Sequence, residues 1–427
     1  MIDMSGIELS EQQRTIVEAN DKNIIVDAAA GSGKTRVLTE RVRRLLKDGV
    51  NPKSMVVITF TNLAADELKQ RLKDVRGISQ CFVGTIHAYA NKILRKSGKQ
   101  FDIFSEEYQT KFMEYLIPKY AKNCTLRDYE EFVKLERLVA SGRIRQADIS
   151  VRMNNQKALD EILQLLGRSY QYTFPETVRT LCEQNNIISF DDLIKETTEY
   201  FNENGCSIEY LFVDEFQDIG YLEYNFLISL NAGHNFVIGD DYQSLYGFKG
   251  GDVNIFLSLM KNPEWKSYAL SENYRTAKNI LMYANSLIKK ANDIIPKEVV
   301  IMRSEMGSLE FKSKSLLDIF LSEIDPSDDW FILTRSNKEM NQVTAILHKQ
   351  NIEHYCFKRS TISKKELDEI LSKKCIKVMT VHAAKGLECE NVALYGRFPT
   401  RKFDNSDEVK VLYVGLTRAK NKCVMFV

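Results

Sequence analysis

A glycine-rich loop suited to binding phosphate lies in the stretch NIIVDAAAGSGKTR, from Asn23 to Arg36. Glycines let backbone N–H groups close on the β- and γ-phosphates, Lys34 brings a positive charge, and Thr35 offers a hydroxyl to Mg²⁺. The first position of the GxxxxGK[ST] pattern holds Ala28 instead of glycine. The alternative, a tight strand-to-helix turn that binds nothing, is disfavoured because an apolar run precedes the loop and a helical pattern follows it.

A pair of adjacent carboxylates, Asp214 and Glu215, ends a second apolar run in the stretch SIEYLFVDEFQD. Ligands of an open α/β sheet collect at the carboxyl ends of its strands. Asp214 is therefore expected to hold Mg²⁺, and Glu215 to orient and deprotonate the water that attacks the γ-phosphorus. A solvated acidic pair after a strand is the alternative, and it weakens once the pair is coupled to the phosphate-binding loop.

A polar residue and two aromatic residues follow the next apolar run, in VIGDDYQSLYGFKGGD. Gln243 can reach a γ-phosphate, and Tyr246 and Phe248 come a few residues later. Each base stacked on an aromatic ring contributes roughly 1 to 3 kcal/mol, so a short segment could couple nucleotide to stacked bases. Taken singly, the two rings are more often core or turn residues.

These residues require strands to position them. Eight short apolar runs rich in β-branched residues recur along the chain, with helical patterns between them. Near-continuous hydrophobicity is typical of strands covered on both faces, which predicts an α/β fold with parallel sheets, grouped into two domains around Pro263. Between about Ile93 and Asn186 the sequence is charged and helix-favouring, and it predicts a helical insertion. The runs lie at residues 24–26, 55–60, 210–216, 235–240, 330–334, 376–381, 391–395 and 422–427.

Composition narrows the class of protein. The 427 residues are enough for two or three domains, and 59 basic against 58 acidic side chains give a net charge of +1, which leaves nucleic-acid binding to a local groove. Eight cysteines without a CxxC pair argue against zinc or iron–sulfur sites and for a reducing cytosol. No apolar run approaches the ~18 residues of a membrane helix, so a cytoplasmic location is expected.

With these motifs in hand, the chain resembles a superfamily 1A DNA helicase of the UvrD, Rep and PcrA type, and the family's motifs occur in the family's order. The resemblance implies two RecA-like P-loop NTPase domains with a helical 1B-like insertion in the first. The matching segments are LSEQQRTIV (Q motif), AAAGSGKTR (Walker A), ITFTNLAADELKQRL (Ia), GTIHAYANKIL (Ib), SFDDLI and VDEFQD (II), GDDYQSLYGFKGGD (III), LSENYRTAKNI (IV), VMTVHAAKGLE (V) and VLYVGLTRAK (VI).

The resemblance assigns roles at an ATP site. Gln13 would read the adenine edge, Tyr274 would stack on the adenine, and Arg36 would lie beside the same base. Arg275 and Arg418 would approach the γ-phosphate from the second α/β domain. The other implied nucleotide-site residues are Ala28, Ala29, Ala30, Gly31, Ser32, Gly33, Lys34, Thr35, Asp214, Glu215, Gln243 and Glu388, with Thr35 and Asp214 at Mg²⁺.

The resemblance also implies a path for single-stranded DNA, along which hydroxyls and histidines contact the backbone and rings stack on bases without sequence preference. Phe248 stands where close relatives often have Trp, and a smaller ring should still stack. A lone histidine is more often structural, so His87 and His382 gain weight only from their motifs. The implied path residues are Phe60, Thr61, Asn62, Thr85, His87, Tyr246, Phe248, Thr380 and His382.

The expected domains are a RecA-like domain 1A at residues 1–94 and 187–263, a 1B-like insertion at 95–186 and a RecA-like domain 2A at 264–427. Only residues 358–374 separate the strand-like region from motif V, so the 2B domain of processive relatives is expected to be missing. The expected function is an ATP-dependent, 3′ to 5′ single-stranded DNA translocase or helicase, using ATP and Mg²⁺ on single strands or tailed duplexes.

The alternative function belongs to a different class: a DNA-activated ATPase switch that regulates a protein partner, such as a nuclease, within a complex. The missing 2B domain motivates it. Compact UvrD-like chains also occur as subunits of bacterial two-component anti-phage systems such as Gabija, and this chain resembles such a subunit. A third hypothesis, a small-molecule P-loop kinase, is disfavoured by the motif around Arg418 and by the paired α/β domains.

Overall fold

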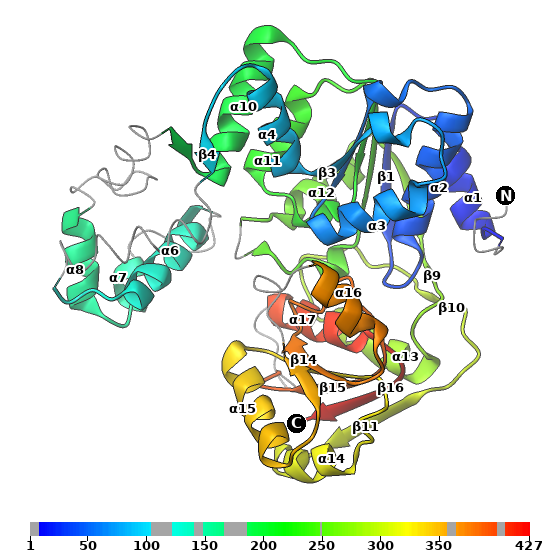
Figure 1. Ribbon diagram of the computed structural model, residues 1–427. Coiled ribbons are helices and arrows are strands. Elements are labelled where there is room, and N and C mark those ends of the chain that lie inside the picture. Colours follow the sequence, from blue (N-terminus) through cyan, green and yellow to red (C-terminus); the bar gives the residue numbers. More distant parts are fainter. Residues whose placement is uncertain are drawn as a thin grey trace. The chain divides into compact units, whose positions relative to one another are not determined.

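The structure, a computed structural model, forms two compact units (Figure 1). Unit 1 contains residues 1–45, 237–245 and 256–427, and unit 2 contains residues 46–236 and 246–255. Phe248, which the sequence places on the DNA path, lies outside the described residues. The structure describes residues 8–103, 122–140, 148–165, 186–247, 250–356, 364–398 and 406–427.

The first large sheet has the strand order β3-β2-β6-β7-β1-β8. In unit 2, β2 pairs in parallel with both β3 and β6, and in unit 1, β1 pairs in parallel with β8. All five residues of β2 are buried, as is typical of a strand covered on both faces. The strands are β1 (Asn23–Ala28), β2 (Met55–Thr59), β3 (Phe82–Thr85), β6 (Tyr210–Val213), β7 (His234–Gly239) and β8 (Lys266–Leu270).

The second large sheet lies within unit 1, in the order β11-β16-β15-β12-β14-β13, and its neighbouring strands all pair in parallel. Trp330 and Ile332 join one hydrophobic cluster, while Phe331 and Leu333 on the alternate face are also buried, so helices cover both faces. The strands are β11 (Ser308–Lys312), β12 (Trp330–Thr334), β13 (His354–Cys356), β14 (Ile376–Thr380), β15 (Cys389–Tyr395) and β16 (Ala419–Phe426).

Several helices around the sheets begin at a serine whose side chain caps the helix. Ser10, Ser189 and Ser336 each form a capping box with the residue three positions later, and this fixes where α1, α10 and α15 begin. The main helices are α1 (Glu11–Glu18), α2 (Lys34–Lys47), α3 (Asn62–Leu72), α4 (Ile86–Lys96), α10 (Phe190–Asn204), α11 (Tyr221–Ser229), α12 (Val253–Lys261), α13 (Lys278–Ile288), α14 (Leu317–Glu323), α15 (Asn337–Lys349), α16 (Lys364–Ser372) and α17 (Ser406–Leu416).

Within unit 2, helix α10 packs beside both α4 and α11 (Figure 1). The region expected to be a helical insertion contains α6 (Leu126–Ala140), α7 (Asp148–Arg152) and α8 (Gln156–Leu165), among which α6 packs against the other two. Two small sheets of two-residue strands complete the fold: β4 (Asp102–Ile103) with β5 (Ile187–Ile188), and β9 (Glu272–Asn273) with β10 (Val300–Ile301).

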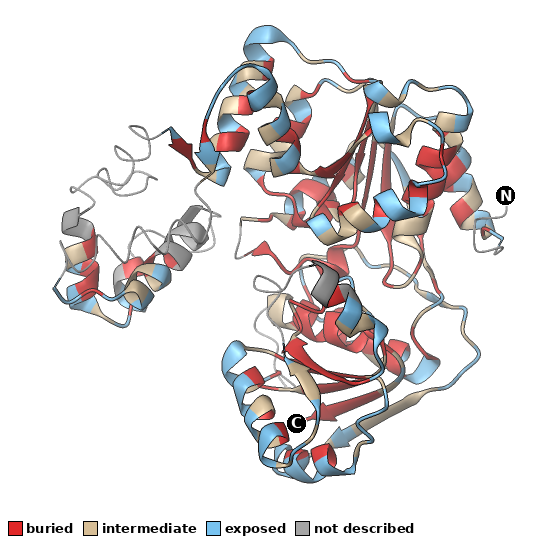
Figure 2. Ribbon diagram, in the orientation of Figure 1, coloured by how far each residue is buried: buried red, intermediate tan, exposed pale blue. Residues whose placement is uncertain are grey.

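The expected α/β class with parallel sheets is confirmed, and each of the eight apolar runs contains a strand. Four strands of the large sheets were not predicted: β3, β8, β11 and β13. They are the edge strands of the two sheets. Figure 2 shows that burial concentrates in the strands, while most helices keep an exposed side; α17 is an exception, with no exposed residue.

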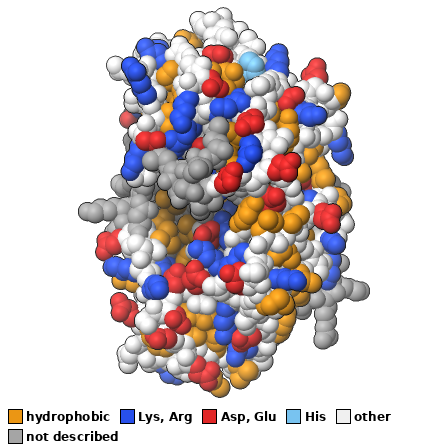
Figure 3. Space-filling model, turned by 90° about the vertical axis from the view of Figure 1, so that its right-hand side faces the viewer, with side chains coloured by type: hydrophobic (Ala, Val, Ile, Leu, Met, Phe, Trp, Pro, Cys, Tyr) orange, Lys and Arg blue, Asp and Glu red, His pale blue; other side chains and the backbone are white. Residues whose placement is uncertain are grey.

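The surface charge of the protein agrees with its composition. On the face drawn in Figure 3, basic and acidic side chains are interspersed, in keeping with a net charge of +1. The described cysteines are all free thiols. Within the described part of the chain, no helix has the length and apolar character needed to cross a membrane.

Candidate nucleotide and DNA site

The phosphate-binding loop joins β1 to α2 in unit 1, and α2 begins at Lys34 itself. Gly31 and Gly33 adopt left-handed backbone conformations, with φ of +67° and +88°. A Cβ on Gly31 would lie 2.7 Å from Arg275 Cβ, and one on Gly33 would lie 2.9 Å from Gln13 Nε2. Glycine is therefore required at both positions for two reasons: the backbone conformation is left-handed, and neighbouring side chains leave no room for a Cβ.

Two residues that the resemblance places at the adenine, Gln13 and Tyr274, also form hydrogen bonds with this loop. Gln13, set by the Ser10 capping box, donates from Nε2 to the Ser32 carbonyl oxygen at 3.1 Å. The Tyr274 N–H donates to the Gly31 carbonyl oxygen at 3.0 Å, while the residue as a whole remains 43% exposed. Because the backbone of Tyr274 is fixed by this hydrogen bond and the residue is exposed, its ring is available for stacking.

Asn273 is a loop contact that the sequence did not single out. Its Nδ2 donates to the Ala30 carbonyl oxygen at 2.6 Å, and its Oδ1 accepts the N–H groups of Arg275 and Thr276. The residue lies inside the ENYR segment that marked Tyr274 and Arg275, and this was the available signal. The side chain links the Walker A loop to the segment that carries those two residues.

Arg418 and Gln243 contact each other in unit 1. Arg418 is 1% exposed, and its Nη2 donates to Gln243 Oε1 at 2.8 Å. Gln243 Nε2 in turn donates to Asp240 Oδ2 at 2.5 Å, and Lys34 Nζ lies 3.8 Å from the same oxygen. A continuous chain of polar contacts therefore runs from the guanidinium of motif VI to the lysine of the phosphate loop. Lys385, another residue not predicted, donates to the Gln243 carbonyl oxygen at 2.7 Å.

Arg275 and Glu388 also meet, in an ion pair of 2.6 Å from Nε to Oε2, and Lys420 lies 3.0 Å from the other carboxylate oxygen. Burial alone would raise the pKa of Glu388, but Arg275 and Lys420 hold that pKa below its ordinary value.

Thr35 and Arg36 occupy the first turn of α2, and the Thr35 carbonyl oxygen accepts from Thr39 Oγ1 at 2.6 Å.

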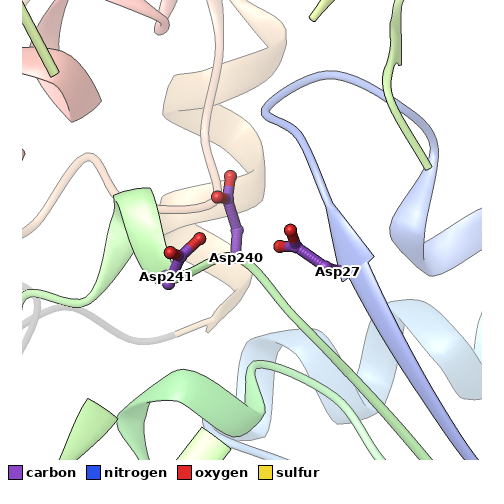
Figure 4. Close-up of side chains that lie close together, drawn as sticks. All are labelled: Asp27, Asp240 and Asp241. Atoms are coloured by element: carbon purple, nitrogen blue, oxygen red, sulfur yellow. The ribbon is translucent and has the colours of Figure 1, made fainter. Parts of the chain in front are cut away.

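Behind the loop lies a buried acidic cluster of Asp27, Asp240 and Asp241, which the sequence did not reveal as a unit (Figure 4). Asp27 belongs to β1, and the other two directly follow β7. Lys297 Nζ contacts Asp27 Oδ1 and lies 2.6 Å from Asp241 and 3.0 Å from Asp240. A protein ammonium thus provides the positive charge that such a cluster would otherwise take from a metal ion.

The cluster sets the charge states of its members. Burial, together with Asp241 and Asp240, raises the pKa of Asp27 to about 6 in spite of Lys297. Burial also acts to raise the pKa of Asp240, yet the ammonium groups of Lys297 and Lys34 keep it below its ordinary value. The three carboxylates keep the pKa of Lys297 well above its ordinary value although burial opposes this, so Lys297 is charged.

Asp214 and Glu215 lie in unit 2, directly after β6. The Asp214 N–H donates to the Ile58 carbonyl oxygen at 2.9 Å, which fixes this end of the strand against β2. Glu215 has a φ of +53°, which is uncommon for a residue other than glycine and is one of the strained conformations that cluster at functional sites. Gln217 Nε2 donates to Glu215 Oε2 at 2.6 Å and orients its carboxylate.

The implied DNA-path residues fall in both units. In unit 2, the rings of Phe60 and Tyr246 stack with centroids 4.7 Å apart and planes 24° apart, which brings motifs Ia and III together. In unit 1, Thr380 ends β14, its Oγ1 accepts the Ala383 N–H at 3.2 Å, and His382 follows two residues later.

Two threonines of this path also cap helices. Thr61 Oγ1 accepts the Ala64 N–H at the start of α3, with Asn62 as the first helical residue, and Thr85 Oγ1 accepts the Ala88 N–H at the start of α4. A hydroxyl that accepts such a bond still has its own proton to donate, for example to a phosphate oxygen.

His87 packs edge-on against Phe190, with ring centroids 4.9 Å apart. Burial lowers the pKa of His87, although Asp191 opposes this. The ring is therefore mainly neutral near pH 7, which favours a hydrogen bond to DNA over an ion pair with it.

Comparison with known proteins agrees with the motifs. Residues 9–264 match the UvrD/REP helicase N-terminal domain, and residues 356–427 match the UvrD-like helicase C-terminal domain. A probable DNA helicase of Mycoplasma pneumoniae is 30% identical, with 96% of this chain and 82% of that protein aligned. The ATP-dependent DNA helicase PcrA of Leuconostoc citreum and DNA helicase II of Escherichia coli are also 30% identical, over 81% and 68% of this chain. The chain spans less than half of each of these two relatives, 49% and 42%. The chain belongs to the UvrD/REP helicase family of superfamily 1A.

Proposed function

We propose that the protein is an ATP-dependent single-stranded DNA translocase and DNA helicase. The observation that carries the proposal is the chain of contacts from Arg418 through Gln243 and Asp240 to Lys34. This chain joins motif VI, motif III and the Walker A loop, the three parts that must act together on a triphosphate. Membership of the UvrD/REP helicase family supports the same activity.

At the nucleotide, Lys34 and the loop N–H groups bind the phosphates, and Gln13 and Tyr274 hold the adenine. Arg275 and Arg418 neutralise the charge that develops on the γ-phosphate, a contribution of about 10³ to 10⁵ in rate where arginine fingers have been measured. Glu215 accepts a proton from the attacking water. Thr35 and Asp214 supply the hydroxyl and carboxylate oxygens that Mg²⁺ prefers, and the ion would draw charge from the phosphate oxygens.

At the DNA, the stacked pair of Phe60 and Tyr246 offers an aromatic platform, and Thr61 and Thr85 offer hydroxyls to the backbone. Tyr246 lies three residues after Gln243, so a change at the γ-phosphate has a short covalent path to the platform. We propose that ATP binding and hydrolysis alternate the grip on the strand and move the protein from 3′ to 5′. The domain boundaries expected from the sequence remain part of this proposal.

Displacement of streptavidin from biotinylated oligonucleotides tests the direction of movement. With ATP, the protein should displace streptavidin faster from the 5′ end than from the 3′ end, and Lys34→Ala should displace it from neither. Faster displacement from the 3′ end would refute the polarity. ATP hydrolysis that depends on DNA without displacement from either end would instead favour the ATPase switch that acts on a protein partner.

A further inference from the structure

Lys297 is a buried cation without a role in the ATPase chemistry proposed above. Its side chain is 8% exposed, and its ammonium lies against Asp27, Asp240 and Asp241. The residue is also held by its backbone, because its N–H donates to Tyr242 Oη at 2.9 Å. The ammonium lies 4.4 Å from the centre of that tyrosine ring. Lys297 is therefore fixed at both ends.

Asp240 connects this cluster to the nucleotide site. Its Oδ1 lies 3.0 Å from Lys297, whereas its Oδ2 accepts from Gln243 Nε2 at 2.5 Å and lies 3.8 Å from Lys34 Nζ. The Asp240 side chain is completely buried. One carboxylate therefore faces two ammonium groups, and only one of them is needed at the phosphates.

A buried carboxylate must have a counter-charge, and leaving one unpaired is strongly unfavourable. Lys297 meets this need at hydrogen-bonding distance, while Lys34 lies near the limit of an ion pair. If Lys297 were neutral, Lys34 would become the nearest cation to Asp240. A triphosphate would then have to compete with Asp240 for the Lys34 ammonium.

We propose that Lys297 is a positioning residue that neutralises Asp240 and thereby keeps Lys34 available to the phosphates of ATP. This inference rests on the proposed ATPase function and adds a residue to it. Lys297 touches no phosphate itself. Its effect is on nucleotide affinity, because it sets the charge balance beside Lys34.

Two double variants with equal charge test the proposal. Lys297→Met alone leaves buried carboxylates unpaired and can unfold the protein, so each double variant also removes one carboxylate. Lys297→Met with Asp240→Asn removes the carboxylate that faces Lys34. Lys297→Met with Asp241→Asn restores the same net charge but leaves Asp240 to attract Lys34. The asparagine at position 240 keeps an oxygen that can accept from Gln243.

The measurements are the KM for ATP, the kcat with saturating single-stranded DNA, and calorimetric binding of a non-hydrolysable ATP analogue. The variant that retains Asp240 should bind the analogue roughly tenfold or more weakly than the Asp240→Asn double variant, within the usual range of coupled sites. It should show a higher KM with kcat largely retained, as expected when a ground-state interaction is lost. Equal affinity in the two double variants would show that Lys297 only balances charge, and would overturn the proposal.

Lys34→Ala separates this inference from the proposed function. If the wild type and Lys34→Ala bind the analogue equally, the proposed nucleotide site is wrong. If analogue binding depends on Lys34 but the two double variants do not differ, only the role of Lys297 is wrong.

Discussion

Gly31→Ala should loosen the contact between the phosphate loop and the segment that carries Tyr274 and Arg275. Position 31 has a φ of +67°, and the new Cβ would lie 2.7 Å from Arg275 Cβ. Left-handed backbone costs alanine about 1 kcal/mol or more, and an ordinary carbon contact is about 3.5 to 4.0 Å. The segment must therefore move by about 1 Å, which weakens the Tyr274 to Gly31 and Asn273 to Ala30 hydrogen bonds, each worth about 1 kcal/mol.

The sum is a loss of roughly 2 to 4 kcal/mol in the free energy of unfolding, from the strain and the two hydrogen bonds. Gly49→Ala is the matched control, because Gly49 has a φ of +93° with no atom within 4 Å of the new Cβ, so only the strain of about 1 kcal/mol applies. Urea denaturation measures the loss, and ATP hydrolysis should fall by up to roughly 10²-fold in Gly31→Ala alone. Equal stability and activity in the two variants would refute the close packing of loop and segment.

Three further predictions concern single residues. The pKa of Asp27 rises from 3.8 to about 6 on folding, so the stability that Asp27 contributes is present below about pH 4 and is lost as the pH passes 6. From about pH 4 to pH 7, the unfolding free energy of Asp27→Asn relative to that of the wild type should therefore shift by up to roughly 3 kcal/mol in the variant's favour. A pH-independent difference in chemical denaturation would contradict the raised pKa. Phe60→Ala should weaken single-stranded DNA binding by roughly 5- to 150-fold in fluorescence anisotropy, because it removes a ring of the aromatic platform on which a base would stack, whereas Tyr200→Ala should not. Glu215→Gln should lower kcat by about 10² or more with little change in ATP affinity, and a retained kcat would exclude Glu215 as the general base.

The sequence predicted the interior strands of the two large sheets and missed their edge strands. β12 and β14 lie inside their sheet and are buried on both faces, and apart from Lys377 and the threonine that ends each strand their residues form an apolar run. The edge strands β8 and β11 read KSYAL and SLEFK, with polar residues and at most partial burial at most positions. An edge strand has a single neighbour and a more exposed surface, so its sequence carries no such run. Their places in the sheets depend on pairing with distant strands.

The residues of the candidate site also differ in how far the sequence could predict them. Lys34, Gln243 and Arg418 each stand in a motif, and the structure brings them into one chain of contacts. Lys297 stands alone in the stretch DIIPKEVV, and only the fold gathers its carboxylate partners from β1 and the end of β7. One signal was present, because Asp27 interrupts the apolar run IIVDAA. A charge inside a buried strand needs a partner, and that requirement could have prompted the search for one.

The rate of ATP hydrolysis with and without saturating single-stranded DNA, in the wild type and Arg418→Ala, tests the proposed function most directly. We expect DNA to stimulate the wild type strongly and Arg418→Ala to lower the stimulated kcat by about 10³ or more. Lys373→Ala removes an exposed lysine that is paired with Glu369 and lies outside the matched motifs, and this variant should hydrolyse ATP like the wild type. A stimulated rate in Arg418→Ala equal to that of Lys373→Ala would contradict the proposed function.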